Sequence, residues 1–182
     1  FTQDRGAGPA PGMADTERYS NEAIRGLWRE MATMGWLAAP LAEEFGGLGL
    51  PDATLIVMRE LGANLLASPF ASAVAAANAL LAGSSAVALL TAVADGTLRI
   101  ALADRERSRS VATARQKGDG FSLDADKTHI LDAGIATHFC VPALIKDGEL
   151  ALFLVPANAD GLAGSVRKTP HGTPVGSIRF EA

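Results

Sequence analysis

Residues 34–49 read Met34-Gly-Trp-Leu-Ala-Ala-Pro-Leu-Ala-Glu-Glu-Phe-Gly-Gly-Leu-Gly49, a glycine-rich stretch between two segments with helical periodicity. Gly46 and Gly47 permit positive φ angles, which a sharp reversal of the chain needs. The stretch also carries apolar side chains that we expect to be buried around the reversal: Trp36, Leu37, Leu41, Phe45 and Leu48. The pattern predicts a compact turn that joins two helices and shapes the fold without taking part in a reaction.

The residues on both sides of this turn predict helices. Before it, a helix capped by Ser20 or Asn21 runs to Gly35 and carries apolar residues at helical spacing, namely Ile24, Leu27, Trp28, Met31 and Met34. After it, a helix begins near Pro51 and Asp52 and places four apolar residues on one stripe, namely Leu55, Met58, Leu61 and Leu65. Two more helices are predicted over residues 70–82 and 84–94, the second stopped by Asp95-Gly96.

From Leu98 onwards the periodicity changes to short runs rich in Val, Ile, Thr and Phe, separated by glycine-containing turns. We expect strands over residues 98–103, 111–116, 127–131, 141–145, 150–155, 164–169 and 177–180. The clearest hairpin joins 141–145 to 150–155, because Asp147-Gly148 suits a type I′ turn.

The predicted fold class is therefore α+β, with an all-α helical domain followed by an antiparallel β-sandwich or barrel. We expect a flexible segment over residues 1–18, the helical domain over 19–96 and the β domain over 97–182.

Composition excludes several classes of function. A chain of 182 residues with 48% hydrophobic residues can bury a core, and its net charge of −4 gives no general attraction for nucleic acid. The single Cys140 cannot form an internal disulfide, which favours a reduced, cytoplasmic setting. We expect no membrane span and no secretory signal, because the long apolar run and the charged leader that these need are missing. His129, His138 and His171 lack the spacing of a metal site, so we predict no structural metal.

The turn resembles the G-W-x-x-x-x-x-P-E-E-Y/F-G-G-x-G segment of the acyl-CoA dehydrogenase family, although the proline lies at Pro40 and Ala42 stands in its usual place. A second stretch, residues 118–134, resembles the family pattern G-D-G-Y/F-x-L-N-G-x-K-x-W-I-T-N-A/G. The resemblance implies the first two of the family's three domains, without its C-terminal four-helix bundle. It also implies FAD as cofactor, an acyl-CoA thioester as substrate, an electron-transfer flavoprotein or similar acceptor, and assembly into a homo- or hetero-oligomer.

In that family a glutamate removes an α-proton of the thioester while hydride passes from the β-carbon to the flavin. The glutamate belongs to the C-terminal bundle, so the resemblance assigns no catalytic residue to this chain. Glu43, Glu44 and Asp52 are interpreted as solvated carboxylates or a helix cap.

Two segments match the family's flavin-binding segments, and they place the cofactor-binding positions at Leu102 and Ile130. In the first segment, residues 101–110, Ala103 replaces a threonine. In the second, His129-Ile130-Leu131 replaces W-I-T, so an imidazole replaces the aromatic wall and an aliphatic group replaces a hydroxyl donor. Two interpretations stay open: the chain binds flavin through backbone donors and His129, or it is a partner subunit of a heteromeric enzyme that has lost its own flavin pocket.

Arg105, Arg107 and Arg109 alternate with other residues in the first segment. At strand spacing they would share one face and meet the phosphates of coenzyme A or an acidic partner. A solvated loop is the alternative, and it is the interpretation that we favour.

Overall fold

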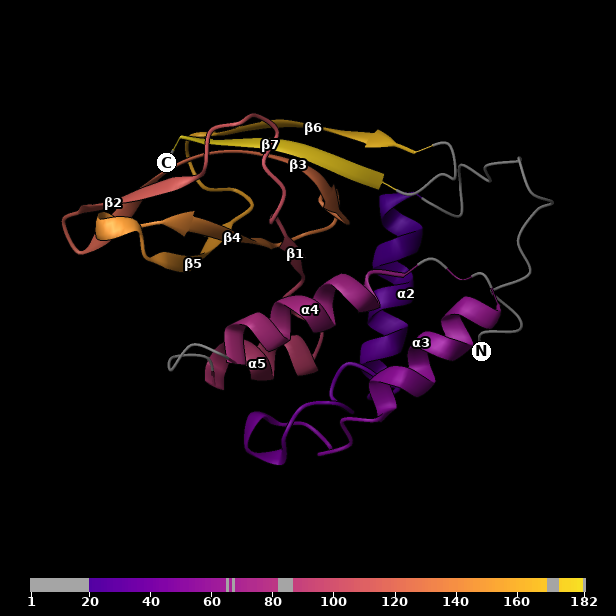
Figure 1. The fold of residues 1–182 in the computed structure, drawn as a ribbon. Helices are drawn as coiled ribbons and strands as arrows, with labels where there is room; N and C mark the ends of the chain where they lie inside the picture. The colour runs from indigo at the N-terminus through magenta and orange to yellow at the C-terminus, as the bar shows by residue number, and fades with distance from the viewer. Residues whose placement is uncertain (1–19, 65, 67, 82–86, 170–173, 182) are drawn as a thin grey trace.

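The computed structural model describes residues 20–64, 66, 68–81, 87–169 and 174–181. The segment 1–18, for which we predicted flexibility, lies outside these residues. Within these described residues, four α-helices come first: α2 (Asn21–Thr33), α3 (Ala53–Ala63), α4 (Phe70–Leu81) and α5 (Val87–Ala94). Seven strands follow: β1 (Ile100–Leu102), β2 (Thr113–Lys117), β3 (Gly120–Leu131), β4 (His138–Leu144), β5 (Leu150–Pro156), β6 (Leu162–Lys168) and β7 (Pro174–Glu181). The predicted α+β order is confirmed, and the helices lie against one side of the strands (Figure 1).

Helix α2 follows the sequence prediction closely. The N–H of Ala23 donates to Oγ of Ser20, which is the N-cap. Four residues of the predicted stripe are buried, namely Ile24, Leu27, Trp28 and Met31. The fifth, Met34, lies beyond the last helical turn and is 41% exposed. Gly35 ends the helix with a φ of 73°.

The glycine-rich turn folds back on itself, and its two central glycines serve different purposes. Residues 47–50 donate backbone hydrogen bonds to residues 38–42, and the turn contains a short 3₁₀ helix, η1 (Glu43–Phe45). Gly46 has a φ of 79°, as predicted, whereas Gly47 does not have a positive φ. A Cβ on Gly47 would lie 2.0 Å from the carbonyl oxygen of Leu41. Gly47 is therefore required by close backbone approach, and our prediction that it needs a positive φ was wrong.

The predicted apolar stripe of α3 was right at Leu61 and wrong at Leu55 and Met58. Val57 and Leu61 are buried, whereas Leu55 is 71% exposed and Met58 is 39% exposed. Leu65 lies outside the described residues. The helix is apolar on more than one face, so its period alone did not decide which face meets α2 and α4. Leu48, another side chain that we expected to be buried, is 55% exposed beside this region.

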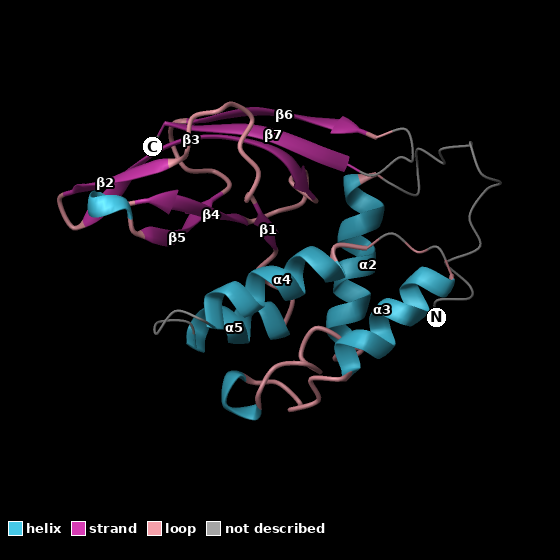
Figure 2. Cartoon of the chain, in the orientation of Figure 1, coloured by secondary structure: helices cyan, strands magenta, loops and turns pink. Residues whose placement is uncertain are grey.

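The strands form one curled sheet with the order β1-β4-β2-β3-β7-β6, and β5 pairs with the other side of β4 (Figure 2). Most pairs are antiparallel, but β1–β4 and β2–β4 are parallel. The sheet is therefore mixed, and the expectation of a purely antiparallel domain needs this correction. Strand β1 pairs with residues 138–140 of β4 and β2 pairs with Leu144 of β4, while β5 pairs with β4 over residues 138–144.

The β4–β5 hairpin has the predicted partners but a different turn. Residues 146–148 form a 3₁₀ turn, η2 (Lys146–Gly148), and Gly148 has a φ of 80°. Ile145 and Glu149 close the loop through the Ile145 N–H and the Glu149 carbonyl, 2.8 Å apart. The turn is a three-residue loop that ends in a left-handed glycine, so the two-residue type I′ prediction was wrong.

Substitution of Gly47 tests the packing of the turn, with Gly26 in α2 as the control. Gly47→Ala should cost about 1–3 kcal/mol, because its methyl group would force Leu41 and the returning chain apart. Gly26→Ala is the matched control, since a Cβ there meets nothing within 4 Å in the interior of α2. It should stabilise the protein by roughly 0.5–1 kcal/mol. Chemical denaturation measures both; equal effects of the two substitutions would contradict the assignment.

Candidate functional site

The structure brings together the two segments that the sequence singled out. After β1 the chain leaves β4, where the Ala103 N–H donates to the Cys140 carbonyl at 2.9 Å, and crosses to β3. There the Thr128 N–H donates to the Arg105 carbonyl at 2.9 Å, and the Arg107 N–H donates to the Asp126 carbonyl at 2.8 Å. Residues 105–107 thus lie beside β3 immediately before His129–Leu131. We call residues 102–105 and 129–131 together the β-domain edge.

A β-bulge shapes this edge. Lys127 pairs with Ile178 and Ile130 pairs with Gly176, so β3 has two residues, Thr128 and His129, where β7 has one. His129 has a φ of 56°, a conformation in which histidine is found more often than most residues. The bulge shifts the inward-facing positions of β3 from odd to even numbers. Leu123, Ala125 and Lys127 face inward before it, and Ile130 does so after it.

The predicted cofactor-binding positions therefore differ in what they offer. Ile130 is fully buried in the β core, so only its backbone is available to a ligand. Leu102 is partly buried and packs against the helical core, and Ala103 is fully buried. His129 is exposed and Leu131 is 48% exposed.

Side-chain hydroxyls contribute little to this edge. The Oγ atoms of Thr128 and Ser177 lie 2.9 Å apart and bond to each other. The groups left for a ligand are the imidazole of His129, the apolar surface of Leu131 and the backbone. This set fits a flat heteroaromatic ring held by stacking and main-chain hydrogen bonds.

The inside of the sheet holds an ion pair that the sequence analysis missed. Lys127 is 1% exposed, and its Nζ donates to Oε1 of Glu106 at 2.6 Å and to the Pro142 carbonyl at 3.0 Å. The same Oε1 accepts from the Ala112 N–H at 3.1 Å, while Oε2 of Glu106 is buried without a hydrogen-bond partner. The signal that could have revealed this ion pair is the position of Lys127, two residues after Ala125 and therefore on the same face of the strand. We predicted the strand only from Lys127 onwards, so the alternation was not visible.

Residues directly after the β-domain edge join the two parts of the molecule. Ser72 of α4 donates from Oγ to Oδ2 of Asp132 at 2.5 Å. Burial raises the pKa of the Asp132 carboxyl, and the hydrogen bond from Ser72 offsets part of that effect. The residue has a φ of 60°, which aspartate tolerates.

Three arginines lie along the same junction. Nη2 of Arg25 donates to the Gly134 carbonyl at 3.2 Å, and Nε of Arg99 donates to the Ile135 carbonyl at 2.8 Å. The pKa of Arg99 is lowered by burial and then by the positive charges of Arg25 and Arg29. The junction therefore has a positive potential along α2.

A cavity of about 310 Å³ lies between the glycine-rich turn, α3, α4 and α5. Its lining is mostly apolar, with Thr54 and Asn78 as polar side chains, and includes Leu37, Leu41, Leu55, Val74 and Val93. It can accommodate an apolar group but offers no acid, base or nucleophile.

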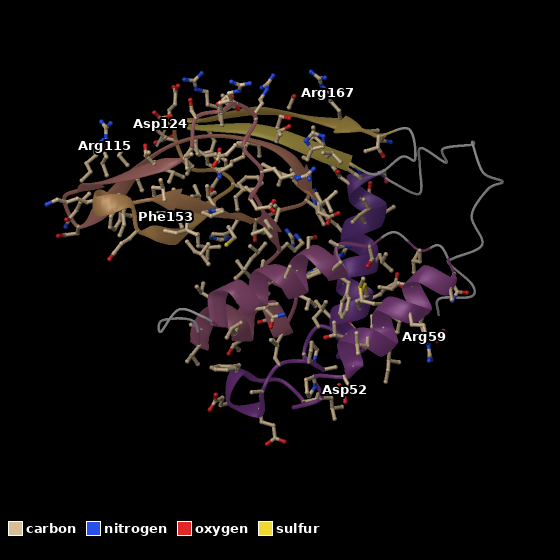
Figure 3. All side chains as sticks on the ribbon, viewed as in Figure 1. Asp52, Arg59, Arg115, Asp124, Phe153 and Arg167 are labelled. Carbon is tan, nitrogen blue, oxygen red and sulfur yellow. The ribbon has the colours of Figure 1, made fainter. Side chains whose placement is uncertain are left out.

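The remaining candidate groups lie at the surface. Arg105, Arg107 and Arg109 are exposed in the loop after β1 and do not lie in a strand. Figure 3 shows Arg115, Asp124 and Arg167 on the outer surface of the sheet, away from the helices. Glu43 and Glu44 are exposed, and Asp52 precedes α3 without a capping hydrogen bond from its side chain.

Within the described residues, no three His, Cys, Asp or Glu side chains are placed to share a metal ion. In the same part of the chain, no helix has the length and apolar character needed to cross a membrane.

Comparisons with known proteins support this arrangement. The family model described as "Acyl-CoA dehydrogenase, N-terminal domain" matches residues 5–93. A variant of the Tcur3481-Tcur3483 steroid ACAD is similar at 28% identity and a TM-score of 0.79, over 92% of this chain and 51% of that chain. The ChsE4-ChsE5 complex from Mycobacterium tuberculosis is similar at 27% identity and a TM-score of 0.78, over 99% of this chain and 53% of that chain.

Glutaryl-CoA dehydrogenase from Mycobacterium smegmatis shares the fold at 21% identity, with a TM-score of 0.78 over 100% of this chain and 50% of that chain. A search of curated proteins found no significant match. The helices, the curled sheet and their order along the chain are those of the similar solved structures. The family model places residues 5–93 in the N-terminal domain of the acyl-CoA dehydrogenase family, and the similar structures extend the likeness of fold over the rest of the chain. It spans about half the length of the solved structures that it matches.

The Asp132–Ser72 contact generates a pH prediction. A carboxyl group whose folded pKa is raised binds more protons in the folded state than in the unfolded state, so its contribution to stability falls as pH rises above the unfolded value near 3.8. Asp132→Asn keeps an acceptor for Ser72 and a residue that tolerates positive φ. The stability of the Asn variant relative to wild type should therefore increase between about pH 3.8 and pH 7.

Urea unfolding across this pH range measures the difference, with Asp52→Asn at an exposed helix start as the control. A difference for Asp132→Asn that does not change with pH would contradict the prediction.

Proposed function

We propose that this chain forms part of an FAD-dependent acyl-CoA dehydrogenase that introduces a double bond between the α and β carbons of an acyl-CoA thioester. One observation supports the proposal: two segments that resemble the family's flavin-binding segments are separate in the sequence but lie close together at the β-domain edge. The proposed domains are the helical part over residues 19–96 and the β part over residues 97–182.

The proposed cofactor site uses the chain's own groups in a limited way. Leu102 and Ile130 would contribute backbone contacts, and His129 would stack its ring against the flavin face. FAD would supply the hydride acceptor when bound. The thioester and an electron-transfer flavoprotein or similar acceptor are the proposed partners, in a homo- or hetero-oligomer. A reducing compartment such as the cytoplasm suits the buried thiol of Cys140.

A second candidate function follows from the same edge. Leu131 presents an aliphatic side chain where the family pattern has a hydroxyl, and Ala103 removes another hydroxyl. Two of the similar structures bear the names of two proteins, Tcur3481-Tcur3483 and ChsE4-ChsE5. These observations favour a partner subunit that completes a heteromeric dehydrogenase without holding flavin itself.

The visible absorption spectrum of the purified protein distinguishes the two functions. Stoichiometric flavin bound by the protein alone supports the dehydrogenase that holds its own cofactor. Flavin bound only after a candidate partner chain is added supports the partner subunit. Absence of flavin in both preparations would contradict the proposed function.

Leu131→Thr tests the edge directly. A threonine hydroxyl would restore a donor toward the flavin, so the FAD dissociation constant should fall roughly fivefold, the effect of one net hydrogen bond of about 1 kcal/mol. Fluorescence titration measures the change. Leu152→Thr is the control, because Leu152 is 43% exposed on β5 and is comparable in exposure with Leu131. Equal affinities of the wild type and the Leu131 variant would show that more than this hydroxyl is missing.

A further inference from the structure

The ion pair inside the curled sheet lies near the shortest strand pairing of the sheet. Strands β2 and β4 are neighbours, yet they share a single residue pair, Thr113 with Leu144. The segment after β1 fills the space that this short pairing leaves between β4 and β3. It is bonded to β4 at Ala103 and to β3 at Arg105 and Arg107.

Glu106 lies at the centre of that segment and forms an isolated β-bridge with Lys127. Its side chain turns inward, whereas the neighbouring Arg105 and Arg107 are exposed. Lys127 reaches across the inside of the sheet to the Pro142 carbonyl of β4. The pair therefore connects three parts of the domain: the segment after β1, β3 and β4.

Both members of the pair depend on each other electrostatically. Lys127 is almost entirely buried among apolar side chains, and a buried ammonium group without an anion is strongly unfavourable. Glu106 has one oxygen that accepts two hydrogen bonds and one buried oxygen that accepts none. Loss of either partner leaves an uncompensated charge next to the bulge, and the segment must move to expose that charge to water.

We propose that Glu106 and Lys127 are positioning residues that hold the segment after β1 against β3 and so set the geometry of the β-domain edge for its ligand. Neither side chain needs to touch the ligand. Through Glu106, the pair holds the backbone of residues 103–107. Through Lys127, it holds the part of β3 that directly precedes the bulge at Thr128 and His129. The ligand assignment rests on the proposed function, whereas the effect of the pair on the edge is a property of the protein alone.

The test compares four variants of the protein. Glu106→Gln removes the anion and keeps an acceptor for the Ala112 N–H, and Lys127→Met removes the cation at similar length. The double variant removes both charges. Glu60→Gln is the matched control, because Glu60 pairs with Arg59 at 3.1 Å on the exposed surface of α3.

Hydrogen exchange is the first readout. In Glu106→Gln, the amides of Arg107, Thr128 and residues 129–131 should exchange about tenfold faster or more, while those of α2 should keep their wild-type rates. The double variant should recover part of the protection that Lys127→Met loses, because it leaves no unpaired buried charge. If Lys127→Met does not fold, Glu106→Gln and the double variant still decide the outcome. Wild-type exchange rates at the edge in both would overturn the inference.

FAD affinity is the second readout. If the wild type binds FAD, the dissociation constant should rise about tenfold in Glu106→Gln and remain unchanged in Glu60→Gln. Faster exchange with unchanged FAD affinity would overturn the positioning role, because the pair would then be purely structural. If the wild type binds no FAD, alone or with its partner, the proposed function fails. In that case the hydrogen exchange of residues 129–131 alone decides whether the Glu106–Lys127 pair fixes the geometry of the β-domain edge.

Discussion

The contact between α4 and the chain that leaves β3 is the constraint on which the arrangement of the molecule depends. Asp132 is one residue beyond the β-domain edge, and its carboxylate accepts a hydrogen bond from Ser72 of α4. Arg99 donates to Ile135 through its side chain and to Oγ1 of Thr137 through its backbone N–H. The helical part is thus fixed to the same short loop that continues from the bulge. A ligand at the edge would contact residues whose positions are set by both parts of the protein.

Helix α2 reinforces this junction from the other side. Nε1 of Trp28 donates to the Gly96 carbonyl at 2.8 Å, at the point where the chain passes from α5 toward β1. Gly96 has a φ of 77°, and a Cβ there would lie 2.6 Å from Cβ of Ala32. The buried indole therefore combines burial of a large apolar surface with a polar contact to the linker. The path of β1, and hence the start of the edge, depends on this packing.

Local sequence signals predicted the helices and strands well, but they predicted less well which face of each helix or strand is buried. The cap at Ser20 and the stop at Gly35 were visible because they depend on residues within one turn. The buried face of α3 depends on which neighbour packs against it, and a helix with apolar residues at Leu55, Val57, Met58 and Leu61 allows more than one answer. The parallel pairing of β1 with β4 joins residues 38 positions apart, so no local pattern carried it.

The candidate site shows the same division between local and tertiary information. Sequence resemblance predicted that two segments bind the cofactor, and the structure brings these two segments close together. The bulge could not be predicted, because the expected strand began at Lys127 and left out Leu123 and Ala125, whose inward positions define the register before the bulge. The inward position of Ile130 and the outward positions of His129 and Leu131 follow from that one extra residue. The pairing of Glu106 with Lys127, 21 residues away, likewise needed the fold.

The bulge also bears on which side chains suit the backbone of the edge. The family pattern has tryptophan where His129 lies, but a φ of 56° is unfavourable for a bulky aromatic residue and tolerable for histidine. His129 is therefore matched to the local backbone. The buried positions around it, including Ala125, Ile130 and Phe180, form a well-packed apolar core. The departures at His129 and Leu131 are confined to side chains that point outward, whereas Ala103 is buried. The family pattern is therefore lost mainly at exposed side chains, over a core that is well packed, so the bulge and the backbone of the edge are held in place by the core whichever contact the edge makes.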